Sequence, residues 1–201
     1  MHTNLKTIVK FKACADGITK LMNNLGHKCN RCNWRNVYNS LTPEQQTKDI
    51  DFKFILKSNG VKDTFWCLYT QPKKIRMLIS ADVAESILHI YEEQYPNDMR
   101  VRNCIQGVRD YCDGKITQER LNVLKQDAAD AAYDVYDIVV VDAAADVVKA
   151  AYDVADAAHT VAYAAYAAAD AVNVAIGIVD VHIVAVAERW KKNEEILLKY
   201  C

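Results

Sequence analysis

The sequence predicts an all-α protein, a helical bundle with a long Ala/Val-rich C-terminal helical region. Residues 127–187 hold 22 Ala and 14 Val, no Pro and a single Gly at position 177, and Ala is the strongest helix former. The segments before this run carry apolar residues three and four positions apart, which is the spacing of one helical face. No segment shows a convincing strand pattern.

Local signals before Pro72 predict short helices and one loop. Leu5–Asn24 has helical apolar spacing, and Gly26 stands where a C-terminal cap belongs. Thr42 is expected to start a helix through a capping box, in which the Gln45 side chain reaches back to the Thr42 backbone. The other segments expected here are a polar loop at 27–36 and helices at 51–57, closed by Gly60, and at 61–69.

Two stronger amphipathic patterns follow Pro72. Lys73–Tyr95 is expected to be one helix, and Asp98–Cys112 the next, ended by Gly114 and followed by a new helix that Thr117 can cap. The buried stripe expected in the first helix consists of Ile75, Leu78, Ile79, Val83, Ile87, Leu88, Ile90 and Tyr91. The exposed face of the second carries Arg100, Arg102 and Arg109.

The C-terminal region is too long to be one isolated helix. As a straight helix, residues 118–200 would extend about 125 Å, and their Ala/Val faces would have nothing to pack against. We therefore expect this region to fold back or to pack on another subunit, which predicts a homo-oligomer. The expected bends are the β-branched run 139–141 and Gly177.

Charge is distributed unevenly along the chain. Residues 1–126 contain 20 Lys and Arg against 13 Asp and Glu, a net charge of +7, whereas residues 127–201 contain 5 against 13, a net charge of −8. These halves either face each other or form ordinary solvated surfaces. Together with the pattern of elements, they suggest a basic helical part at 1–116 and an Ala/Asp/Tyr-rich part at 117–201, which we expect to form one continuous domain.

Seven cysteines and the absence of an apolar N-terminal segment indicate a cytoplasmic protein with free thiols. The most apolar window, 157–187, contains Asp170 and Asp180. Each Asp would cost roughly 2.5–3.5 kcal/mol at the centre of a bilayer, so we expect no membrane span.

The loop at 27–36 allows three interpretations. Cys29 and Cys32 with nearby His27 form half of a zinc-knuckle pattern, but a structural zinc site needs four ligands and no second pair lies at the usual spacing. The alternative is a loop with two reduced thiols. The loop also contains Trp34 between basic residues, which could stack on a base and contact its phosphate.

Several short motifs in a fixed order resemble the "putative immunity protein" family found in phages and bacteria. They are Ala13-Cys14, Asn59-Gly60, Trp66-Cys67-Leu68, Lys73-Lys74-Ile75-Arg76, Asp98-Met99-Arg100 with Tyr111 and Gly114, and the Ala-rich tail from Asp127. The resemblance covers about residues 10–187, although this tail uses Asp and Tyr where the family also has Arg and Trp. The resemblance implies a protein that blocks a toxin or, in phages, interferes with a defence of the host. If a phage encodes the chain, we expect it in the cytoplasm of the host cell.

No catalytic motif is present, so we expect a non-enzymatic protein without a cofactor. The phage context of the resemblance favours an anti-defence protein that sequesters a small phosphorylated nucleotide signal. Arginines would hold the phosphate and aromatic rings the base, and Arg102 and Arg109 share a helical face. The candidate ligand-binding residues are Arg76, Arg100, Arg102, Arg109, Tyr69, Tyr133, Tyr136 and Trp34.

Two alternatives to nucleotide sequestration remain open. One is an immunity or inhibitor protein that binds a toxin or host defence protein directly. The other is an acidic nucleic-acid mimic, but ten Asp between 127 and 180 give one charge per about 8 Å of helix. B-DNA carries one per about 1.7 Å, so mimicry would require subunits that align their acidic stripes.

Overall fold

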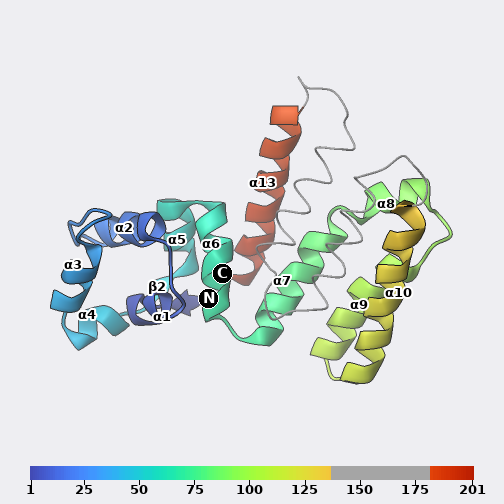
Figure 1. The fold of residues 1–201 in the computed structure, drawn as a ribbon, viewed down its shortest axis with the longest axis horizontal. Helices are drawn as coiled ribbons and strands as arrows, with labels where there is room; N and C mark the ends of the chain where they lie inside the picture. Colours follow the sequence, from blue (N-terminus) through green and yellow to red (C-terminus); the bar gives the residue numbers. More distant parts are fainter. Residues whose placement is uncertain (137–181) are drawn as a thin grey trace. The chain divides into compact units, whose positions relative to one another are not determined.

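The computed structural model describes residues 1–136 and 182–201, and these are predominantly helical (Figure 1). The all-α prediction is therefore confirmed. The chain divides into two compact units. Unit 1 contains Met1–Pro72 and Tyr200–Cys201, and unit 2 contains Lys73–Lys199.

Unit 1 is made of short helices and one small strand pair. Strand β1 (His2–Thr3) pairs antiparallel with β2 (Ile50–Asp51), with Thr3 opposite Ile50. The helices are α1 (Leu5–Lys10), α2 (Ala15–Asn24), α3 (Trp34–Ser40), α4 (Pro43–Thr47), α5 (Phe52–Asn59), α6 (Val61–Cys67) and the 3-10 turn η1 (Leu68–Thr70). Its largest fully buried side chains include Ile8, Ile18, Leu21, Met22, Phe52, Ile55, Phe65 and Leu68.

The prediction of one helix over Leu5–Asn24 is wrong, because the chain breaks between α1 and α2. Lys12 has a φ of 61°, a left-handed conformation that ends α1. The Cys14 Sγ then accepts a hydrogen bond from the Gly17 N–H at 3.3 Å and caps α2. The apolar spacing continues across this break, so the pattern is that of a single helix.

The predicted caps of unit 1 are confirmed. Gly26 has a φ of 89°, and the N–H of His27 donates to the Met22 carbonyl, which forms a Schellman turn after α2. Thr42 and Gln45 form both hydrogen bonds of the capping box. Gly60, with a φ of 91°, closes α5. These signals are read correctly because they depend on neighbours within a few residues.

Unit 2 centres on α9 (Arg100–Cys112), which packs against α7 (Lys73–Glu85) and α10 (Gln118–Tyr136). Helix α8 (Leu88–Gln94) lies between α7 and α9 in the chain, and α13 (His182–Tyr200) is the last helix. Gly107 permits close packing of α9 on α10, since a Cβ there would lie 2.4 Å from the Leu124 Cδ1. Fully buried residues of this unit include Met77, Ile79, Val83, Tyr91, Val101, Cys104, Val108 and Ala128.

The prediction of one helix over Lys73–Tyr95 is also wrong, because α7 ends at Glu85 and α8 starts at Leu88. The Ser86 hydroxyl donates to the Val83 carbonyl, a local bond that competes with helix continuation. The buried face differs from the predicted stripe as well. Ile75 and Leu78 are only half-buried, whereas Met77, Ser80, Ala81 and Ala84 are buried.

The expected bends at 139–141 and Gly177 lie outside the described residues, as does most of the Ala/Val-rich run. Thr117 does cap α10, with its Oγ1 accepting from the Arg120 N–H. None of the described helices is long and apolar enough to cross a membrane.

Candidate functional site

Each of the three arginines of α9 predicted to bind a ligand is paired with a carboxylate of unit 2. The Arg100 Nη2 lies 2.6 Å from the Asp98 Oδ2. Arg102 contacts Glu92 of α8 through two nitrogens, Nε at 2.6 Å and Nη2 at 2.5 Å. Both partners precede α9 in the chain. These guanidiniums are therefore held in fixed positions by intramolecular hydrogen bonds.

Arg109 bridges α9 to α7. Its Nη2 lies 2.8 Å from the Asp82 Oδ1 and 2.7 Å from the Glu85 Oε2. The side chains of Arg109 and Asp82 are only 22% and 20% exposed, whereas that of Glu85 is 50% exposed. The bond to Asp82 is thus the better shielded of the two. Arg102 and Arg109 are about 10 Å apart along the helix axis, and each contacts its own acidic partner.

Asp98 is the centre of a polar cluster. It accepts hydrogen bonds from the Tyr91 hydroxyl at 2.8 Å, from the Arg100 backbone N–H at 3.0 Å and from the Arg100 guanidinium. The Arg100 side-chain bond, opposed by burial, lowers the pKa of the Asp98 carboxyl from 3.8 to about 2. Burial and then the bond to Asp98 raise the pKa of Tyr91. The cluster fixes the turn from α8 into α9.

A surface hollow lies at this turn. It has a volume of about 440 Å³ and is lined by Tyr95, Pro96, Asn97, Asp98 and Arg100. Met99, which lies in the chain between the lining residues Asp98 and Arg100, is 46% exposed. We call residues 95–102 the α8–α9 corner. It presents an aromatic ring, a thioether and two fixed arginines.

Sequence patterns alone do not identify this corner as a site. In the sequence, Asp98-Met99-Arg100 is only one of several family motifs, and Tyr95 is only the expected end of a helix. One signal is present, since Pro96 and the Asn97-Asp98 pair mark an exposed turn that holds an apolar Met. That signal does not reveal the hollow, which requires the positions of both helices.

The other predicted ligand residues are spread over both units. Tyr69 lies in η1 of unit 1, edge-on to the Trp66 ring with centroids 6.3 Å apart. Arg76 is half-buried in α7 and has interaction partners of its own. Tyr133 and Tyr136 lie near the end of α10, where the described structure gives the course of the backbone only.

Trp34 is placed at the start of α3 and is only 6% exposed. The Arg35 guanidinium lies 4.9 Å from the centre of its ring. The predicted loop thus ends earlier than expected, at residue 33. The indole contributes to the core of unit 1, and its partner in cation–π stacking comes from the chain itself.

His27, Cys29 and Cys32 do occupy the loop after α2. Asn23 holds this loop through two side-chain bonds to the Cys29 backbone, each 2.9 Å long. The Cys29 Sγ faces the Thr19 carbonyl, and burial raises the pKa of this thiol. Within residues 1–136 and 182–201, no three His, Cys, Asp or Glu side chains are grouped as metal ligands would be.

Most of the chain after residue 67 matches one protein family. The profile described as Imm-5 like putative immunity protein matches residues 68–195, more than half of the sequence. The chain belongs to this family. No curated protein and no solved structure matches the sequence. In this Imm-5 like protein, the matched residues include nearly all of unit 2 and therefore the α8–α9 corner and the paired arginines.

Proposed function

We propose that this Imm-5 like protein acts as an immunity protein that binds a partner protein directly, through the α8–α9 corner, without catalysing a reaction. The partner is a toxin or a defence protein. The observation that carries the proposal is the exposed Met99 beside the hollow of Tyr95 and Arg100. The corner lies within the residues that match the family.

The chemistry of the corner is that of a protein interface. Aromatic residues, Met and Arg are enriched at interface centres relative to the rest of a protein surface. A flexible thioether fills irregular gaps in a partner surface. Arg100 and Arg102 are already held by Asp98 and Glu92, so little side-chain entropy remains to be lost when a partner docks.

Sequestration of a phosphorylated nucleotide is the competing function, and the arginine geometry supports it less well. A phosphate at Arg102 would have to displace a bidentate carboxylate, and at Arg109 it would meet both Asp82 and Glu85. The negative charge of these acids opposes a second anion. Docking of a protein surface requires no such displacement, because the paired charges can stay in place.

The two buried thiols, Cys67 and Cys104, are unsuited to nucleophilic catalysis. Burial raises the pKa of Cys67 and of Cys104 to about 12. A thiol with such a pKa remains protonated near neutral pH, and only the thiolate is a good nucleophile. Burial also raises the pKa of Cys112.

Site-specific photocrosslinking tests the proposal and captures the partner in one experiment. A photoreactive amino acid is placed at Met99 of the full chain, and a matched variant carries it at Val123 of α10, which is 48% exposed. The crosslinked protein is identified, purified and measured for binding to unlabelled wild-type chain. A partner crosslinked at position 99 only, which also binds the wild-type chain, supports the proposal.

A parallel titration with cyclic nucleotides and ADP-ribose-type signals separates the two functions. Binding of a nucleotide that is released intact, together with loss of binding in Arg102→Gln, would favour sequestration and contradict direct protein binding at the corner. Equal crosslinking at positions 99 and 123 would also contradict it, since the corner would then have no preference for a partner.

A further inference from the structure

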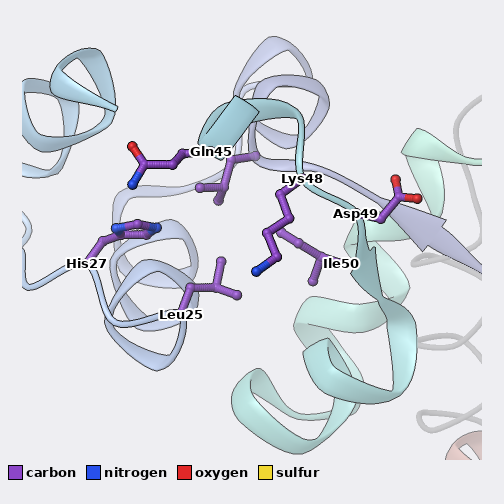
Figure 2. Close-up of a pocket in the computed structure, with 7 residues that line it drawn as sticks. Leu25, His27, Gln45, Lys48, Asp49 and Ile50 are labelled. Atoms are coloured by element: carbon purple, nitrogen blue, oxygen red, sulfur yellow. The ribbon is translucent and has the colours of Figure 1, made fainter. Parts of the chain in front are cut away.

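A small pocket in unit 1 lies outside the residues that match the family. Its volume is about 180 Å³, and Figure 2 shows the side chains around it. Three apolar side chains, Leu5, Leu25 and Ile50, form its walls, and both Leu5 and Ile50 are buried. The polar lining consists of His27, Gln45, Lys48 and Asp49.

Local backbone features bring these separate segments together. The Schellman turn at Gly26 reverses the chain after α2 and places His27 at the pocket. The capping box holds the Gln45 Oε1 on the Thr42 N–H at 2.9 Å, which leaves the amide nitrogen of Gln45 available. The pairing of β1 with β2 sets Ile50 beside the start of α1.

Three of the polar side chains, those of His27, Gln45 and Lys48, border the pocket from different sides. In Figure 2 the Gln45 amide nitrogen points to the side of the His27 ring, and the Lys48 ammonium points between Leu25 and Ile50. Asp49 points away from that ammonium. In the part of the chain that the structure describes, Lys48 has neither an ion pair nor a side-chain hydrogen bond. Three potential donors thus surround one apolar hollow.

We propose that this pocket binds a small monocarboxylate whose apolar body is the size of one ring. A cavity of about 150 Å³ is sufficient for benzene, so a group of this size fits the volume measured here. The Lys48 ammonium would form a charge-assisted hydrogen bond to the carboxylate, with His27 and Gln45 as further donors. A single lysine, with Asp49 at the rim, favours a monoanion over a phosphate dianion.

The test uses benzoate as the probe and the full ¹⁵N-labelled chain, followed by NMR titration. Benzyl alcohol serves as the uncharged analogue and acetate as the analogue without a ring. Lys48→Gln removes the pocket cation, and Lys28→Gln is the matched control, since it removes the same charge from an exposed lysine that does not line the pocket. Lys48 is itself exposed, so its replacement leaves the fold intact.

The expected result is saturable benzoate binding with shifts at the amides of His27, Gln45 and Lys48. Benzyl alcohol should bind the wild-type chain about tenfold more weakly or worse, and benzoate should bind Lys48→Gln more weakly by the same factor, because each change removes the charge-assisted bond. Acetate should also bind about tenfold more weakly or worse, because it lacks the buried ring. The affinity for benzoate should be unchanged in Lys28→Gln. Absence of saturable binding would overturn the proposal. Equal binding of benzyl alcohol, or equal weakening by both lysine variants, would also overturn it.

Discussion

Replacement of Asp98 by Asn should destabilise unit 2 by about 2 kcal/mol near neutral pH. Asn keeps the shape and one acceptor oxygen for Tyr91, but removes the charge that Arg100 contacts. The fall of the Asp98 pKa from 3.8 to about 2, at about 1.36 kcal/mol per unit, gives roughly 2.5 kcal/mol as an upper value. The Asp98 side chain is 19% exposed, so solvent screens only part of this contribution.

The pH dependence gives this prediction a definite sign. Because the folded pKa lies below the unfolded one, the stabilisation is fully present above pH about 4. It is lost as pH falls from about 4 to about 2. The difference between wild type and Asp98→Asn should therefore be near 2 kcal/mol at pH 6 and below about 1 kcal/mol at pH 2.5.

Urea unfolding followed by circular dichroism measures both values. Glu93→Gln is the matched control, because it removes an exposed carboxylate of α8 that has no ion pair within the described residues. Its effect should remain within about 0.5 kcal/mol at either pH. A difference for Asp98→Asn that is equally large at pH 6 and pH 2.5 would refute the reasoning, because the loss would then not come from the charge.

Other changes test the packing and the assembly. Arg109→Gln should lower the free energy of unfolding in urea by about 2 kcal/mol, because the bond to half-buried Asp82 is shielded from solvent. Arg102→Gln should lower it by only about 0.5 kcal/mol, because the pair with Glu92 is more exposed. Equal losses in the two variants would contradict this prediction. Gly107→Leu should destabilise the α9–α10 packing by about 3 kcal/mol, since even a Cβ there meets a side chain at 2.4 Å, and an unchanged midpoint would count against it. We also expect self-association through residues 127–187. Ala150→Glu with Ala157→Glu should lower the mass found by light scattering, and a monomeric wild-type chain would oppose the idea.

The sequence is sufficient to predict the features that depend on near neighbours. The capping box at Thr42 and the glycine turns at Gly26 and Gly60 are determined within a few residues, and all are present. The two helix breaks are not predicted because neither contains Gly or Pro. One depends on a left-handed Lys12 and the other on the local bond of Ser86.

The candidate site can be predicted only in part, because its contacts join distant positions. The sequence identifies three arginines of α9 as functional candidates, but not their partners. Arg102 contacts Glu92, ten residues away, and Arg109 contacts Asp82, 27 residues away on another helix. Helical spacing gives the face of a residue but not the helix that packs against that face. The hollow beside Met99 cannot be inferred for the same reason.

The affinity of the crosslinked partner for two surface variants tests the central claim most directly. Met99→Glu places a charge at the α8–α9 corner, and Val123→Glu places the same charge at a similarly exposed position of α10. Loss of an interface anchor costs about 2 kcal/mol or more, which corresponds to a dissociation constant raised about 30-fold. The account predicts that rise for Met99→Glu and an unchanged constant for Val123→Glu. Equal constants for Met99→Glu and wild type would contradict binding through this corner.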